Sequence, residues 1–210
     1  MTSSESCPQS TKPSSDSRLS HRPTPYAVDV AGQGRCSERS HTPFTDEHLK
    51  RLVKIALEDR EGLFERNPHL DKAYRNRLLL IALCQGGALH FVDCKKGLKH
   101  TNGVKDLDVY SFYAKHPKVA WPYRRHGVED FGPSVFGYHP IRRAGFIGRH
   151  VDLMGRALPV KPNDNPVEAV RTWLITSNNP TPWHLRQKAV VGLYPAPYRG
   201  KIVWDHSVDL

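Results

Sequence analysis

Asp106 and Asp108 are the residues whose types and spacing are best suited to chemistry. They lie in residues 104–113, where β-branched and aromatic side chains predominate, which predicts a β-strand. Side chains alternate along a strand, so the two carboxylates are expected on one face, about 7 Å apart. Two such charges repel each other unless a cation compensates them. Mg²⁺ or Mn²⁺ fits best, because these ions take oxygen ligands and keep positions for water and substrate phosphates.

A third carboxylate, Asp152, stands between Val151 and Leu153 in a second predicted strand, residues 149–154. If the two strands are neighbours, Asp152 completes a metal-binding triad with the other two aspartates. The alternative is that Asp106 and Asp108 face solvent on a half-exposed strand and that Asp152 is incidental.

Gly86 and Gly87 follow an apolar run, residues 78–84, that predicts a buried strand, with a continued helix as the alternative. The glycines predict a turn into a short helix, where the backbone can approach a phosphate closely and helix N-terminal amides point toward it. The loop that follows is basic, and Lys99 and Lys105 are candidates to meet phosphate oxygens. A solvated basic loop explains these lysines equally well.

These features occur in the order that is typical of one superfamily of enzymes. An apolar strand, a Gly-Gly turn, an Asp-x-Asp pair and a later single Asp resemble the polymerase-beta-like nucleotidyltransferase superfamily, and in particular its minimal bacterial-type domain. The resemblance covers residues from about 78 to 155. The chain departs from the pattern at Ala88, because the family often has Ser directly after the turn glycine and one phosphate-binding hydroxyl is therefore missing.

The resemblance implies a role for each matched residue. Gly86 and Gly87 would contact the triphosphate, Asp106 and Asp108 would hold two divalent ions, and Asp152 would help to activate the attacking hydroxyl. The implied reaction is metal-dependent transfer of a nucleoside monophosphate from an NTP to an acceptor hydroxyl. The sequence predicts neither the acceptor, nor the base of the NTP, nor the oligomeric state.

Two other functions remain open on the sequence. A catalytically inactive protein of the same fold would bind only nucleotide or RNA, with a basic surface supplying most of the affinity. A metal-dependent nuclease also uses paired aspartates. The nuclease ranks third, because no acidic residue near Asp106 is followed two positions later by Lys.

Two further candidate sites receive less support. Cys84, His90, Cys94 and His100 are possible zinc ligands, but their spacing lacks the close cysteine pair of most structural zinc sites. Residues 117–143, rich in Pro, Gly and Arg, predict a long excursion around the site. Residues 127–137 within it are a possible substrate-facing loop with Tyr123, Arg124 and Arg125 beside it, although an ordinary surface loop is the simpler interpretation.

The surrounding sequence predicts one α+β domain, residues 44–210, after a disordered Ser/Thr/Pro-rich tail, residues 1–43. Helix starts are expected at Thr45, Asn67-Pro68, Asn165-Pro166 and Thr181-Pro182, with a last short strand at residues 200–204. The resemblance adds that the sheet should be small, mixed and flanked by helices.

Charge and composition indicate the class of partner. The chain has 31 Lys and Arg against 21 Asp and Glu, a net charge of +10. Such an excess favours polyanions, so NTP and RNA are the expected partners, with solubility alone as the alternative explanation. Four cysteines without framework spacing and the lack of a long apolar run predict a cytoplasmic protein that makes no contact with membranes.

Overall fold

The computed structural model describes residues 39–99, 101, 103–128 and 150–208, all within one compact unit, Cys36–Leu210. Most of the predicted tail therefore lies outside the described residues. Ser40, however, forms a β-bridge with Val104, and their backbone hydrogen bonds are 2.7 and 2.8 Å long. Folded structure thus extends at least to Ser40.

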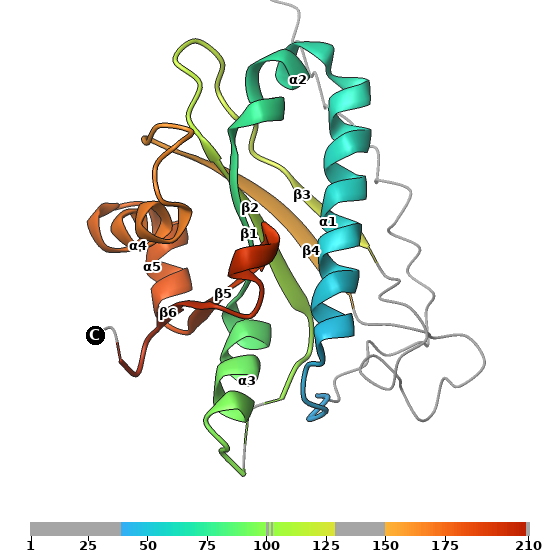
Figure 1. The fold of residues 1–210 in the computed structure, drawn as a ribbon, viewed down its shortest axis with the longest axis vertical. Coiled ribbons are helices and arrows are strands. Elements are labelled where there is room, and N and C mark those ends of the chain that lie inside the picture. The colour runs from blue at the N-terminus through green and yellow to red at the C-terminus, as the bar shows by residue number, and fades with distance from the viewer. Residues whose placement is uncertain (1–38, 100, 102, 129–149, 209–210) are drawn as a thin grey trace, which may run out of the picture. The chain divides into compact units, whose positions relative to one another are not determined.

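A mixed six-stranded sheet forms the centre of the described part, with strand order β3-β4-β2-β1-β5-β6 (Figure 1). Strand β2 is parallel to β4, and the other neighbouring pairs are antiparallel. The predicted mixed sheet flanked by helices is confirmed. The strands are β1 (Leu78–Cys84), β2 (Leu107–Ala114), β3 (Arg125–Val128), β4 (Val151–Leu158), β5 (Ala189–Tyr194) and β6 (Ile202–Asp205). The helices are α1 (Asp46–Arg66), α2 (Pro68–Tyr74), α3 (Gln85–Lys95), α4 (Pro166–Thr176) and α5 (Pro180–Arg186), with 3₁₀ turns η1 (Arg75–Arg77) and η4 (Ala196–Tyr198).

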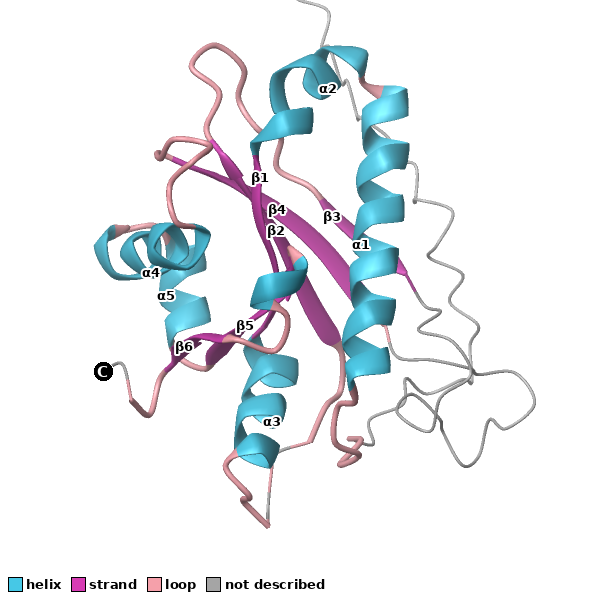
Figure 2. Ribbon diagram, viewed as in Figure 1, coloured by secondary structure: helices cyan, strands magenta, loops and turns pink. Residues whose placement is uncertain are grey.

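Helices cover both faces of the sheet, α1 and α3 on one and α4 and α5 on the other (Figure 2). Strand β1 is buried on both sides, with Ile81 and Leu83 in the core beneath α1 and with Leu80, Ala82 and Cys84 in the core beneath α4. Double burial explains why this strand is a continuous apolar run rather than an alternating one.

The helix starts follow local capping chemistry. Thr45 caps α1 in a capping box with His48: Thr45 Oγ1 accepts from the His48 backbone N–H at 3.3 Å, and His48 Nδ1 accepts from the Thr45 N–H at 3.1 Å. Asn165 caps α4, as predicted. The predicted start of α5 at Thr181 is wrong by two residues, because Asn179 is the N-cap and α5 begins with a proline one position later.

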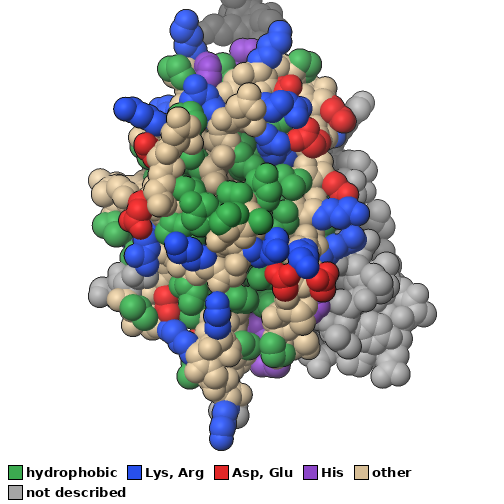
Figure 3. Space-filling model, in the orientation of Figure 1, with side chains coloured by type: hydrophobic (Ala, Val, Ile, Leu, Met, Phe, Trp, Pro, Cys, Tyr) green, Lys and Arg blue, Asp and Glu red, His purple; other side chains and the backbone are tan. Residues whose placement is uncertain are grey.

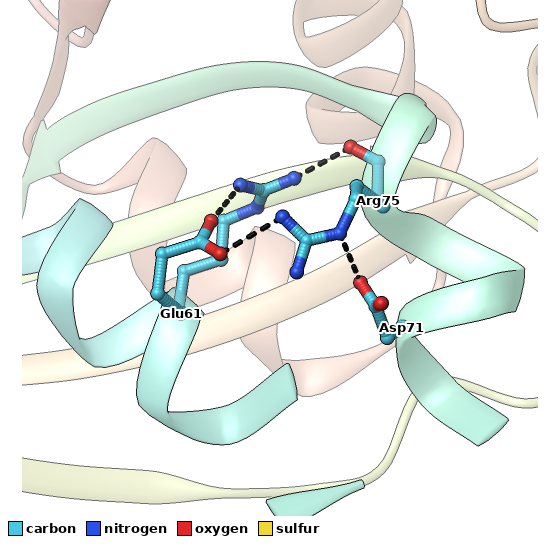
Figure 4. A network of polar contacts seen from close by, with 4 residues as sticks. Glu61, Asp71 and Arg75 are labelled. Atoms are coloured by element: carbon cyan, nitrogen blue, oxygen red, sulfur yellow. Dashed lines mark hydrogen bonds and ion pairs between the residues drawn. The ribbon is translucent and has the colours of Figure 1, made fainter. Parts of the chain in front are cut away.

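An ion-pair network ties α2 to the end of α1 (Figure 4). The Arg75 guanidinium binds Glu61 Oε2 at 2.9 Å and also the Asp71 carboxylate. Arg60 Nη1 completes the network by binding Glu61 Oε1 at 2.6 Å. The Arg75 pairs are partly exposed, and pairs of this kind contribute little stability each.

Two strands were not predicted from the sequence. Strand β3 lies inside the stretch expected to be an irregular excursion, and β5 pairs with β1 and β6.

No helix in the described part of the chain is long and apolar enough to cross a bilayer. On the face drawn in Figure 3, Lys and Arg side chains surround a central group of hydrophobic ones, as the positive net charge leads one to expect.

Candidate functional site

Asp108 and Asp152 are direct neighbours in the sheet. Strands β2 and β4 run parallel, and their register aligns Asp108 with Asp152. On its other side Asp108 is aligned with Cys84, the last residue of β1. Aligned residues of neighbouring strands project from the same face, so both carboxylates lie on the α4 side of the sheet, at one end of three strands.

Asp106 lies one residue before β2 begins, although the predicted strand started at Val104. Its charge nevertheless acts on Asp108. Burial and, to a smaller extent, the charges of Asp106 and Asp152 raise the pKa of Asp108, the charges of Arg125 and Lys188 lower it, and the net result is a pKa of about 6. The charges of the three aspartates and of Arg125 therefore act on one environment.

Asp152 is buried, and both of its carboxylate oxygens have partners. His150 Nε2 lies 2.8 Å from Oδ1, and the Arg125 guanidinium donates to Oδ2. Burial alone would raise the pKa of Asp152, but the hydrogen bonds from Arg125 and His150 outweigh it and lower the pKa overall. Gly127 of β3 makes room for this arrangement, because a Cβ there would lie 2.2 Å from His150 Cε1.

The glycine turn lies beside the carboxylates, since β1 ends at Cys84 and α3 begins at Gln85. The residue with a left-handed backbone is Gln85, with φ of 55°, and no side chain caps the helix. A Cβ on Gly86 would meet nothing within 4 Å, whereas one on Gly87 would lie 3.0 Å from Leu83 Cδ1. Gly86 therefore leaves open space at the helix N-terminus, and Gly87 allows α3 to pack on the sheet.

The predicted lysines and the cations near the carboxylates are different residues. Lys99 and Lys105 are exposed in the segment between α3 and β2. The cations whose charge lowers the pKa of Asp108 are Arg125 and Lys188. Whether Lys99 or Lys105 meets a phosphate therefore stays a prediction.

Of the possible zinc ligands, Cys94 and His90 are neighbours, with Cys94 Sγ 3.7 Å from His90 Nε2, but both ring nitrogens of His90 also have oxygen partners. Buried His90 has Thr101 Oγ1 2.8 Å from Nδ1 and the Thr42 carbonyl oxygen 3.0 Å from Nε2. Burial and the charge of Asp108 raise the pKa of Cys84 well above its usual range. His100 lies outside the described residues, as do residues 129–149 of the predicted excursion.

The donor chemistry fits a hard divalent cation at Asp106 and Asp108. Burial and the charge of Asp106 make the ionised form of Asp108 unfavourable without a cation, and carboxylate oxygens are the ligands that Mg²⁺ prefers. Among the described residues, no three His, Cys, Asp or Glu side chains already converge as a metal site. Asp152 would become a ligand only if Arg125 or His150 turned away, which their side-chain exposures of 61% and 43% permit.

Sequence reasoning missed part of this environment. Arg125 stood in a segment noted for phosphate-binding potential, but its pairing with Asp152 depends on the unpredicted strand β3. His150 could have been predicted as a neighbour of Asp152, because the two residues are two positions apart on a predicted strand and therefore share a face. No sequence pattern indicated that Lys188 lies near the carboxylates, because its position depends on how β5 pairs with β1.

Comparison of the chain with protein-family models, with curated proteins and with solved structures gives no match.

Proposed function

We propose that this chain is a metal-dependent nucleotidyltransferase, which moves a nucleoside monophosphate from an NTP to an acceptor hydroxyl and releases pyrophosphate. One observation carries the proposal: Asp108 is aligned with Asp152 on one side and, on the other, with the residue at which β1 turns into α3. Carboxylates for a cation, on the α4 face, and helix amides without a side-chain cap, on the α3 face, thus lie at the same end of the sheet.

The N-terminus of α3 suits the triphosphate. Its first amides receive no side-chain cap, and Gly86 leaves open space above the backbone. Unsatisfied N–H groups at a helix start favour anions. Arg125, exposed and near the carboxylates, retains guanidinium donors beyond its bond to Asp152 and can bind a phosphate oxygen.

Asp106 and Asp108 would hold the divalent cation. When bound, that ion supplies Lewis-acid stabilisation of phosphate and pyrophosphate oxygens. Asp152 would accept the proton of the acceptor hydroxyl as the hydroxyl oxygen forms the new bond to the α-phosphorus and the bond to pyrophosphate breaks. His150 and Arg125 hold the Asp152 carboxylate in position for that role.

A second candidate is a catalytically inactive protein of the same fold that binds nucleotide or RNA. Both oxygens of Asp152 already have partners, and Ala88 stands where the resembled family often carries a hydroxyl. Nucleotide binding without transfer would follow if Asp152 never exchanges these partners for substrate.

Transfer of label from each of the four α-³²P NTPs into cell extract, with Mg²⁺ or Mn²⁺, tests the proposal. We expect label in an acceptor with the wild type and none with Asp106→Asn/Asp108→Asn. The matched control, Asp93→Asn/Asp164→Asn, removes two carboxylates outside the site and should transfer normally. Nucleotide binding without transfer by the wild type would replace the proposal with the second candidate.

A further inference from the structure

A second feature of the domain is a cavity of about 620 Å³ between α4 and the edge of the sheet at β4. Lys115, Trp121, Tyr123, Arg156 and Trp173 are among its lining residues. Its volume falls within the usual range for ligand sites, about 300–1,000 Å³. None of its lining residues belongs to the carboxylate site.

Arg156, which lines the cavity, projects from the same face of β4 as the carboxylate of Asp152. Side chains alternate along the strand, so Asp152, Met154 and Arg156 project to the same side. The four-residue separation places Arg156 about 13 Å along the strand from Asp152. A ligand that follows this strand can therefore contact both regions.

The charge of the cavity favours an anion. Lys115 and Arg156 are its charged lining residues, and no Asp or Glu is among them. Arg156 is held in place because Nη1 donates to the Gly155 carbonyl at 2.8 Å and Nη2 donates to Thr181 Oγ1 at 3.1 Å. A guanidinium has five N–H donors, so Arg156 keeps donors for a phosphate.

Aromatic side chains complement these cations. Tyr123 is 84% exposed, and the Arg156 guanidinium carbon lies 5.4 Å from the centre of its ring. An exposed tyrosine beside an arginine suits the stacking of a base next to its phosphate. Trp121 also lines the cavity, and its buried indole N–H has no hydrogen-bond partner among the described residues.

We propose that this cavity binds a single-stranded polynucleotide, with a base stacked on Tyr123 and phosphates at Arg156 and Lys115. A mononucleotide is too short to hold its phosphate at Arg156 and present a hydroxyl at Asp152. About four stacked nucleotides at about 3.4 Å each, or fewer in an extended strand, cover the distance. The inference that the polynucleotide is the acceptor, with its terminal hydroxyl at Asp152, rests on the proposed function. The inference that the polynucleotide binds in the cavity does not depend on that function.

Fluorescence anisotropy with a labelled 12-nucleotide single strand of mixed sequence, as RNA and as DNA, tests the binding in EDTA. Tyr123→Ala should weaken binding by about 5-fold or more, the effect of losing one stacked base. The control Trp183→Ala removes another exposed aromatic residue, which does not line the cavity, and should bind as the wild type does. Lys115→Ala should reduce the dependence of affinity on salt.

The outcomes separate the two proposals. Loss of binding in Tyr123→Ala alone supports the cavity as the strand site, and the RNA and DNA arms then show which polynucleotide it prefers. Equal affinities for Tyr123→Ala and Trp183→Ala, or oligonucleotides binding no tighter than AMP, would overturn the inference. Tyr123-dependent binding without any nucleotide transfer would refute the proposed function and leave the cavity assignment standing.

Discussion

The substitution Asp108→Asn should stabilise the metal-free protein at neutral and alkaline pH. Asn has nearly the same size as Asp and carries no charge. In the wild type, burial and the charges of Asp106 and Asp152 raise the pKa of Asp108 from 3.8 to about 6. The folded state therefore binds a proton more tightly than the unfolded state does, and an ionised Asp108 opposes folding.

The magnitude follows from the two pKa values. A change from 3.8 to about 6 corresponds to about 3 kcal/mol, at about 1.4 kcal/mol for each pH unit. Below about pH 4 both states are protonated and the penalty is absent. Between about pH 4 and pH 6 the unfolded state loses its proton first, so stability falls as pH rises, and above about pH 6 the full penalty applies. Asp108→Asn should thus gain up to about 3 kcal/mol at pH 8 and little at pH 4.

Urea unfolding in EDTA at pH 4 and pH 8 measures this difference. Asp164→Asn, which changes an exposed carboxylate on the loop before α4, serves as the control and should show little change at either pH. Mg²⁺ should raise the melting temperature of the wild type but not of Asp108→Asn, because binding to the folded state alone stabilises it. A variant that is less stable at pH 8, or whose effect is the same at both pH values, would refute the electrostatic reasoning.

Three further substitutions have expected outcomes. Gly86→Ala should keep or increase the free energy of unfolding, by up to about 1 kcal/mol, because a Cβ there meets nothing within 4 Å. The same variant should weaken NTP binding in isothermal titration calorimetry, and unchanged affinity would argue against phosphate approach at this turn. Gly127→Ala should move the half-exposed His150 ring off Asp152, because its Cβ would lie 2.2 Å from His150 Cε1, and should cost about 1 kcal/mol in urea unfolding through the lost hydrogen bond; wild-type stability would contradict that packing. Asp59→Asn breaks a bidentate pair with Arg124, in which both N–O distances are 2.7 Å, and should cost about 3 kcal/mol; a loss below about 0.5 kcal/mol by thermal unfolding would show that the pair contributes little.

The sequence was sufficient where a local pattern determined the structure. The apolar run that ends at Cys84 has one structural solution in a sheet with helices on both faces, and the structure makes it strand β1. Thr45 and Asn165 mark helix starts because their side chains bind backbone amides two or three residues ahead. Asp108 and Asp152 come together because two predicted strands are neighbours.

The features that the sequence did not predict depend on contacts between elements far apart in the chain. Strand β3 is four residues long and contains a glycine, so its own sequence gives little β signal, and only its pairing with β4 brings Arg125 to Asp152. Lys188 reaches the same environment through the pairing of β5 with β1. The cavity beside Arg156 arises from the packing of α4 against the sheet, which no local pattern encodes.

A crystal structure with Mn²⁺ and a non-hydrolysable NTP analogue tests the central claim most directly. We predict an anomalous Mn²⁺ peak at coordination distance from the carboxylates of Asp106 and Asp108, with the triphosphate against the first turn of α3. Mn²⁺ and nucleotide bound away from these aspartates, or nucleotide bound while Asp106 and Asp108 contact neither ligand, would contradict the assignment.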